Sequence, residues 1–336
     1  MEDLMGRAAF ARFLTVCSLL WVFGPSPAWS QQTEGASKAP GPPAAAGAKK
    51  TEAKDEGWPK EPGELVFGYL SRGVVVEEFK ELKPLVDYLR KATGMKIQLR
   101  TGLTFEKVFD NIKNGYYDFA YVATAQYAKI RKTVDVHLVG ITTKDGKDKF
   151  AAVVVVRKDS GINAIADLKG KTFLTTKGGL AVHPAPMDLM EKNGVNPKTD
   201  IKIKFGSAPI NCLMDVADRK ADVTAVPKGL WAKAEKMVKK EDLKVIGETE
   251  PVPQLPIIAR PGLDPELVKK VQDALFALKP GHPDYEAVYK NNKNFNGVVP
   301  SKDSDFDQTR RLMAKWMNEP FPGMAPGKPI KTGKKK

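Results

Sequence analysis

Few residues in this chain have the types and the spacing that catalysis or metal binding requires. Its three histidines, His137, His183 and His282, are far apart in the sequence and match no metal-ligand pattern. No Gly-x-Ser-x-Gly motif marks a serine nucleophile. Cys212 lies in a helical-looking stretch, where a buried and inert thiol is the expected state. These observations point away from a metal site and from nucleophilic catalysis.

Asp118 and Asp222 could form a catalytic carboxylate pair, but their surroundings indicate a structural role. Each opens an apolar strand, in the segments GYYDFAYV and RKADVTAV. A turn at the start of a strand explains both aspartates better than acid–base chemistry does. The sequence therefore predicts a protein that is not an enzyme and that uses no cofactor.

A glycine-containing loop is a candidate anion site. Thr175, Thr176, Lys177, Gly178 and Gly179 lie between a predicted strand and a predicted helix. Backbone N–H groups at the start of a helix attract anions, and Lys177 adds a positive charge. The loop matches neither the Walker pattern nor Gly-x-Gly-x-x-Gly, so it does not indicate nucleotide binding. A plain tight turn is the alternative interpretation.

Further candidate contacts lie where predicted strands end or helices begin. Tyr69, Tyr121 and Tyr127 fall at or just beyond strand ends, and His183 directly precedes a predicted helix. In open α/β sheets the ligand crevice lies beyond the carboxyl ends of the strands. Ordinary packing is the alternative for the tyrosines, and for Tyr127 it is the stronger interpretation.

These candidates are positioned by a regular alternation of predicted strands and helices. Helical spacing of apolar residues predicts helices over 79–92, 104–114, 125–132, 184–193, 210–219, 231–239, 264–278, 284–291 and 304–317. Apolar runs predict strands over 64–70, 96–100, 118–122, 136–142, 172–175, 201–205, 222–226, 243–246 and 255–260. The continuous run 150–157 suits either a strand buried on both faces or one crossing between lobes. The alternation predicts two α/β lobes with mostly parallel sheets and helices on both faces.

The first 30 residues have the layout of a secretory signal peptide. Arg7 and Arg12 precede an apolar run of 11 residues, and Ala28 and Ser30 place small residues ahead of a cleavage position before Gln31. A bilayer-spanning helix takes roughly 20 residues, so an uncleaved membrane anchor is the less favoured alternative. The sequence predicts export.

The composition of both ends of the mature chain indicates disorder, and the chain as a whole is basic. Segments 31–62 and 320–336 are poor in apolar residues and are predicted to be a disordered linker and a disordered basic tail. The formal net charge is +14, which can attract an acidic ligand, an acidic transporter or anionic lipid. Nucleic-acid binding is not expected, because the chain has no zinc-finger or RNP-type motif and an exported protein rarely meets nucleic acid.

Several segments together resemble the phosphate/phosphite/phosphonate family of ABC-transporter substrate-binding proteins. They are FGYL (67–70), LKPLVDYLRKATGMKI (82–97), GYYDFAYVATAQYA (115–128), VVVRKDSGINAIADLKGKTF (154–173), VADRKADVTAVPKG (216–229) and LKVIGETEPVPQLPIIARPGL (243–263). The stretch RKDSGINAIADLKGK is the most specific part, and the order and spacing of the segments strengthen the resemblance.

The resemblance implies the type II periplasmic-binding-protein fold, in which two α/β lobes are joined by a two-strand hinge near 154–158 and 250–257. Lobe 1 would comprise 63–155 and 251–319, and lobe 2 would comprise 156–250. It also implies a periplasmic protein that closes on a small ligand and delivers it to an ABC permease and ATPase of the inner membrane. A ligand-binding domain that serves a sensor or acts as a carrier is the alternative. We expect a monomer.

The predicted ligand site joins strand ends of both lobes. Its residues are Tyr69, Ser71, Arg72, Tyr121 and Thr124 on lobe 1, and Thr175, Thr176, Lys177, Gly178, His183, Ser207 and Asn211 on lobe 2. Phosphonate binders of the family carry a Ser-Thr-Ser-Gly loop where this chain reads Thr-Thr-Lys-Gly-Gly. The predicted ligand is therefore a phosphorus oxyanion or phosphonate or, slightly favoured, a larger organic molecule with a polar or acidic end.

The signal-peptide interpretation predicts a mature chain that begins at Gln31, because the small residues at 28 and 30 suit cleavage after Ser30. N-terminal sequencing of the exported protein measures this directly. A retained Met1 in the membrane fraction would contradict the prediction.

Overall fold

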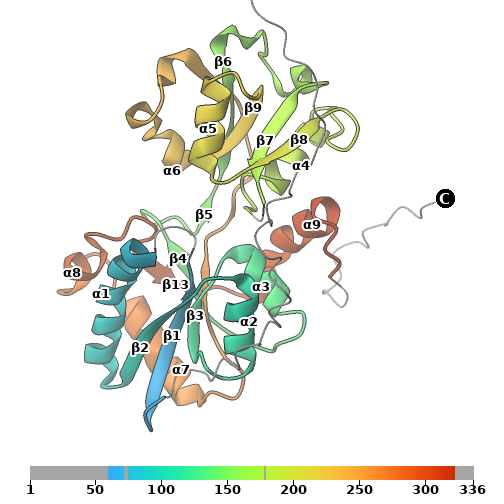
Figure 1. Ribbon diagram of the computed structural model, residues 1–336. Helices are drawn as coiled ribbons and strands as arrows, with labels where there is room; N and C mark the ends of the chain where they lie inside the picture. The colour runs from blue at the N-terminus through green and yellow to red at the C-terminus, as the bar shows by residue number, and fades with distance from the viewer. Residues whose placement is uncertain (1–59, 72–74, 178, 322–336) are drawn as a thin grey trace, which may run out of the picture. The chain divides into compact units, whose positions relative to one another are not determined.

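The computed structural model describes residues 60–71, 75–177 and 179–321, which form two mixed β-sheets, each covered by helices (Figure 1). The predicted signal peptide, nearly all of the predicted linker and most of the predicted basic tail lie outside these residues. Within the described ranges, no helix combines the length and the apolar character needed to cross a bilayer.

The first sheet has the strand order β13-β4-β12-β3-β1-β2. Its strands are β1 (Glu64–Leu70), β2 (Lys96–Gly102), β3 (Phe119–Tyr121), β4 (His137–Thr143), β12 (Pro256–Ala259) and β13 (Gly297–Val299). Phe67 and Tyr69 belong to the apolar cluster formed with α1 (Val75–Thr93), α7 (Pro265–Ala277) and α8 (Tyr285–Tyr289). Val66 belongs instead to the cluster with α2 (Phe105–Lys113) and α3 (Thr124–Ile130). Alternate residues of β1 therefore enter different cores, as the two faces of a covered sheet require.

The second sheet has the strand order β10-β6-β9-β7-β8. Its strands are β6 (Ala152–Arg157), β7 (Thr172–Thr176), β8 (Lys202–Gly206), β9 (Val223–Pro227) and β10 (Leu243–Glu248). Val154 packs in the cluster with α4 (Pro184–Lys192), and Val155 in the cluster with α5 (Pro209–Ala217) and α6 (Lys228–Trp231). The apolar run at 150–157 thus contains a strand that is buried on both faces, which was one of its two interpretations.

The expectation of mostly parallel sheets is wrong, because four strand pairings of the two sheets are parallel and five are antiparallel. Most predicted elements are present, but one predicted helix is also wrong. Residues 231–239 do not form a continuous helix: α6 ends at Trp231, and a 3-10 helix follows at Ala234–Lys236. Ala234 is fully buried there whereas Met237 is 42% exposed, so the segment has no apolar stripe long enough to hold a helix on the sheet. Further 3-10 helices lie at Lys158–Ser160, Ile165–Leu168, Lys240–Asp242 and Asp303–Phe306, the last directly before α9 (Asp307–Trp316).

Two short strands form a separate antiparallel ladder. In the sequence, each lies where the chain passes from one sheet to the other. They are β5 (Lys149–Phe150) and β11 (Val252–Pro253), with Phe150 opposite Val252. The Thr124 hydroxyl lies 3.1 Å from the Pro253 carbonyl oxygen and ties the start of α3 to this ladder. The whole of β6 belongs to the second sheet, so the expected boundary after residue 155 falls inside a strand. We therefore propose that the first crossing between lobes lies at 149–151, before the expected position 154–158.

Helix α9 contacts helices of both sheets. Its side chains Leu312, Met313 and Trp316 join the apolar cluster that contains Met187 and Met190 of α4. The Lys315 ammonium lies 3.1 Å from the Asp188 carboxylate of α4. On the side of the first sheet, Ala125 and Ala128 of α3 belong to the same apolar cluster, and Glu319, which follows α9, pairs with Lys129 of α3 at 3.1 Å. The C-terminal helix is therefore a structural part of both lobes.

Asp118 and Asp222 hold equivalent positions in the two sheets. The Asp118 carboxylate accepts the Val66 N–H at 2.8 Å, and the Asp222 carboxylate accepts the Thr172 N–H at 2.7 Å. Each aspartate also donates its own N–H to the carbonyl of the same partner residue. These bonds fix β3 beside β1 and β9 beside β7, which confirms the predicted structural role of both residues. Asp118 is 2% exposed and also pairs with Lys60 at 2.7 Å and with Arg260 at 2.9 Å.

Replacing Asp118 by alanine is expected to lower the free energy of unfolding by about 3 kcal/mol, because it leaves the Val66 N–H and two partly buried cations without their acceptor. Chemical denaturation measures the loss. The matched control is Asp87→Ala, which removes an exposed carboxylate that also pairs with two cations, Lys83 and Arg90. Exposed pairs contribute about 1 kcal/mol or less, so equal losses in the two variants would contradict this account.

Candidate functional site

The second sheet brings most of the predicted lobe 2 residues to one edge. Thr175 and Thr176 end β7, while Ser207 directly follows β8 and Asn211 lies in the first turn of α5. Strands β7 and β8 are parallel, with Thr176 opposite Gly206, so their carboxyl ends lie side by side. This edge is where ligands bind in open α/β sheets. Gly178 lies outside the described residues.

Two of these hydroxyl groups already have protein partners. The Thr175 hydroxyl donates to the Val182 carbonyl oxygen at 2.5 Å and is fully buried. The Ser207 oxygen accepts from the Asn211 amide at 2.8 Å, which leaves the Ser207 proton available. Within the described part of the chain, the Thr176 hydroxyl makes no hydrogen bond. Thr176 and Ser207 are therefore the hydroxyl donors that this edge can offer to a ligand.

The start of α4 differs from an anion-binding helix terminus. Pro184 and Pro186 occupy its first turn and have no N–H. The Ala185 N–H donates to the Leu180 carbonyl at 3.1 Å, and the Met187 N–H donates to the His183 carbonyl at 3.4 Å. The first turn of α4 thus has no unpaired backbone N–H, although such groups are what makes helix starts attract anions.

Beside this turn, the side chains of Lys177, His183 and Phe205 form a cluster. Phe205 was not among the site residues predicted from the sequence. The His183 and Phe205 ring centroids are 5.3 Å apart, and the Lys177 ammonium lies 5.4 Å from the Phe205 centroid. His183 is 7% exposed, and its Nδ1 has no hydrogen-bond partner among the described residues. Burial lowers the pKa of His183, so the imidazole is neutral at neutral pH.

In the first sheet, the two predicted tyrosines are buried core residues. Tyr69 of β1 lies opposite Tyr121 of β3, and they are 1% and 5% exposed. The Tyr69 hydroxyl donates to the Val75 carbonyl at 3.4 Å, and burial raises its pKa. The Tyr121 ring lies 5.1 Å from the Phe295 ring. Both side chains pack beneath the edge of the sheet, and in this structure little of either is exposed to a ligand.

The remaining lobe 1 residues also have internal partners. The Ser71 hydroxyl donates to the Glu78 carboxylate at 2.6 Å, and Thr124 is held by the β11 segment as described above. Tyr127 packs against Phe306, and its hydroxyl donates to Asp303 at 2.6 Å, which confirms packing as its role. Arg72 lies outside the described residues.

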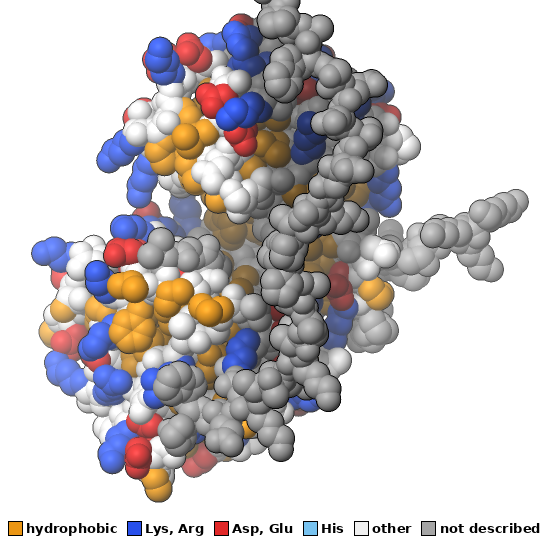
Figure 2. All heavy atoms as spheres, viewed as in Figure 1, with side chains coloured by type: hydrophobic (Ala, Val, Ile, Leu, Met, Phe, Trp, Pro, Cys, Tyr) orange, Lys and Arg blue, Asp and Glu red, His pale blue; other side chains and the backbone are white. Residues whose placement is uncertain are grey.

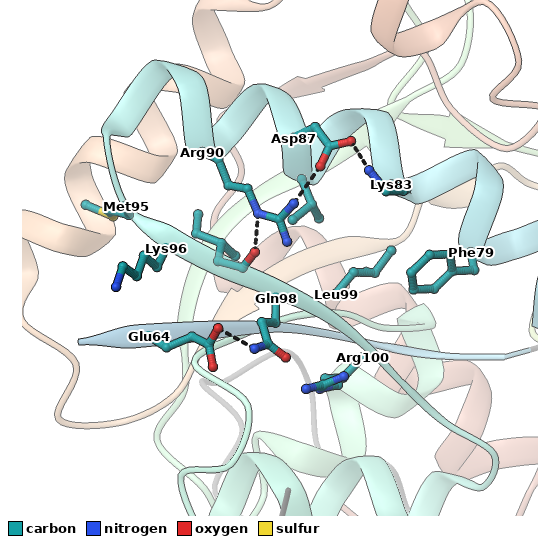
Figure 3. A pocket seen from close by; sticks show the side chains of 12 residues that line it. Glu64, Phe79, Lys83, Asp87, Arg90, Met95, Lys96, Gln98, Leu99 and Arg100 are labelled. Carbon is teal, nitrogen blue, oxygen red and sulfur yellow. Dashed lines mark hydrogen bonds and ion pairs between the residues drawn. The ribbon is translucent and has the colours of Figure 1, made fainter. Parts of the chain in front are cut away.

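A separate hollow of about 500 Å³ lies along the outer edge of β2, beneath α1 (Figure 3). Arg90 donates from Nε to the Ile97 carbonyl at 2.5 Å and also pairs with Asp87. Arg90 thereby occupies one carbonyl of an edge strand, and charged side chains at such edges disfavour pairing with another chain. Figure 2 shows apolar side chains gathered over this part of the lobe, and the exposed Val76 and Phe79 belong to α1. None of the predicted site residues lines this hollow.

No group of three or more histidine, cysteine or acidic side chains suited to a metal ion occurs within the described residues. Among the same residues, Cys212 is buried and free, and burial raises the pKa of its thiol. The arrangement at the edge of the second sheet offers hydrogen bonds, one cation and an aromatic surface. These groups can hold a molecule, and no acid–base pair lies among them.

The burial of His183 predicts a pH dependence of stability. Its pKa in the folded state lies below the ordinary value of 6.5, so the unfolded chain binds more protons once the pH falls below about 6.5. The contribution of the neutral His183 to the free energy of unfolding is fully present above that pH and is lost as the pH falls through the folded-state pKa. Denaturation between about pH 7.5 and about pH 5 should therefore show a steeper loss for the wild type than for His183→Gln, which cannot titrate. Parallel curves would contradict the prediction.

Solved structures with this fold share low sequence identity with the chain. A protein of Xanthomonas citri bound to ATP is 20% identical, covers 75% of this chain and 96% of its own, and has a TM-score of 0.63. PhnD1 of Prochlorococcus marinus, in complex with methylphosphonate, is 15% identical, covers 77% and 99%, and has a TM-score of 0.64. The binding protein component of an ABC phosphonate transporter of Pseudomonas aeruginosa is 18% identical, covers 74% and 85%, and has a TM-score of 0.59. These matches confirm the type II periplasmic-binding-protein fold with two α/β lobes.

A sequence profile assigns the family. The profile of the phosphonate ABC transporter periplasmic substrate-binding proteins matches residues 67–306, which include both sheets and most of their helices. This match confirms the resemblance seen in the sequence and the prediction that the protein is not an enzyme. The chain belongs to the family of periplasmic substrate-binding proteins of phosphonate ABC transporters.

Proposed function

We propose that this protein binds an organic molecule larger than a simple phosphonate, with one polar or acidic end, between its two lobes. Hinge bending at the β5–β11 ladder closes the lobes on the ligand, and the closed form delivers it to an ABC permease and its ATPase. The polar end lies at the carboxyl edge of the second sheet, near Thr176, Lys177 and Ser207. The protein acts as an exported monomer whose mature chain begins at Gln31.

The observation that carries this proposal is the shortage of donors for a small anion. Of the five serine and threonine hydroxyl groups predicted for the site, those of Ser71, Thr124 and Thr175 donate to protein acceptors. The two prolines of α4 remove the backbone donors that a tetrahedral oxyanion would use. An oxyanion whose oxygens lose water without gaining hydrogen bonds is poorly bound. A ligand with a single acidic group and an apolar body requires fewer donors.

The fold itself accommodates ligands of very different size. The Prochlorococcus marinus protein holds methylphosphonate, and the Xanthomonas citri protein was solved with ATP. A larger ligand in this chain is therefore compatible with the architecture. The basic character of the chain, at +14, favours an acidic group on that ligand.

A thermal-shift screen of the mature protein tests the ligand class. Phosphate, phosphite, methylphosphonate and a set of larger organic acids are compared at equal concentration. We expect the larger acids to raise Tm and the three small oxyanions to have little effect. A ligand at a hundred times its Kd stabilises by about 2.7 kcal/mol, which such a screen detects.

The control variants are Thr176→Val at the proposed site and Thr199→Val, an exposed position that precedes β8 at the opposite end of the strand. Stabilisation by the best ligand should fall in the first variant and persist in the second. Strong stabilisation by methylphosphonate that Thr176→Val abolishes would show that a simple phosphonate is the ligand.

A further inference from the structure

Phe205 is a large aromatic side chain left exposed at the carboxyl edge of the second sheet. It is 48% exposed, although it lies in β8 directly opposite the fully buried Thr175 of β7. Successive side chains of a strand alternate between faces, so Phe205 shares a face with Ile203, which packs against the α4 core. The strand thus places Phe205 on the α4 side of the sheet, beside the start of that helix.

The two neighbours of Phe205 are a cation and a buried imidazole. The Lys177 ammonium is 5.4 Å from the ring centroid, and the His183 ring centroid is 5.3 Å away at an interplanar angle of 48°. These contacts limit the orientations available to the phenyl ring without covering it. His183 is 7% exposed, yet its Nδ1 has no partner among the described residues. Nearly all buried polar groups in proteins have a hydrogen-bond partner, so this atom is suited to one supplied by a ligand.

We propose that Phe205 is a stacking surface for a planar, unsaturated ligand body, with Lys177 pairing with the acidic group and His183 Nδ1 bonding to a polar atom of the ligand. The substrate class is therefore an aromatic or similarly flat organic acid. This inference rests on the proposed function, since it names the ligand class for the same site.

The chemistry of the phenyl ring favours this class over a bare oxyanion. The face of an aromatic ring carries partial negative charge, so an anion gains nothing by lying against it. A flat unsaturated body gains contact area and offset stacking, and its removal from water adds the hydrophobic contribution. The Lys177 ammonium lies over the Phe205 ring, 5.4 Å from its centroid, so a flat ligand that stacks on the ring meets this cation with its acidic group. A single exposed aromatic residue needs no explanation by itself, but here the cation and the unpartnered imidazole lie beside it.

Matched pairs of probes isolate the contribution of the ring. Phenylphosphonate and methylphosphonate carry the same charged group and differ in the planar body, and benzenesulfonate and methanesulfonate form a second pair. Titration calorimetry on the mature wild-type protein should give a Kd at least ten-fold lower for the aryl member of each pair. Phe205→Leu should bring the ratio close to one, and Phe205→Tyr should retain it.

Two further variants separate stacking from charge and from general effects. Lys177→Ala should weaken binding of both members of a pair by the same factor, because both carry the anion. Phe79→Leu, at a 37% exposed phenylalanine of α1, should leave every Kd unchanged. Circular dichroism verifies that each variant is folded, and the Phe205→Tyr comparison holds even if Phe205→Leu is unstable.

The outcomes distinguish this inference from the proposed function. If the wild type binds both members of each pair with equal affinity, Phe205 is not a stacking surface. The proposal that the protein binds an acidic solute would still stand in that case, because the probes bind. An aryl preference that survives Phe205→Leu would also overturn the stacking surface. Failure of all four probes to bind would overturn the ligand class together with the acidic-ligand proposal.

Discussion

In each of the two sheets, the arrangement of the strands depends on an aspartate carboxylate directly before a central strand. Asp118 and Asp222 each exchange two hydrogen bonds with one residue of the neighbouring parallel strand. Because a shift of one residue would move every side chain of a strand to the other face, these bonds fix which residues enter which core. They also fix where the strands end, and thereby which loops meet at the carboxyl edge. The position of the candidate site follows from contacts at the opposite end of the strands.

The strands were largely predictable, since most are short apolar runs, and β3, β6, β7, β9 and β12 are buried on both faces. Strand β1 coincides with its predicted range, and most others differ by one or two residues. Strands β5, β11 and β13 were missed because runs of two or three residues carry no periodic signal. The segment 231–239 failed for the opposite reason: its lysines and few apolar residues resemble an amphipathic helix, but Ala234 is buried while Met237 is 42% exposed, so no continuous apolar stripe is present.

The position of the site was predictable, but the chemical state of its residues was not. The sequence indicates that Thr124 and Thr175 lie at element ends, yet it does not show that their hydroxyl protons are used by Pro253 and Val182. Phe205 was missed because an aromatic residue at the end of a strand resembles a core residue. The signal that could have found it is the pattern of β8, where Lys202 and Lys204 mark a solvated edge strand.

Helix α9 has a consequence for the order in which the protein is made. Residues 152–248 contain every strand of the second sheet, but the apolar cluster on one face of that sheet includes Leu312, Met313 and Trp316. During synthesis the second lobe therefore emerges from the ribosome long before the helix that completes its surface. Met187 and Met190 of α4 share a cluster with side chains that are still untranslated at that stage. The lobe encoded in the middle of the chain therefore cannot be completed until α9 has been made, and a nascent chain stopped before residue 312 would leave an apolar face of the second sheet uncovered.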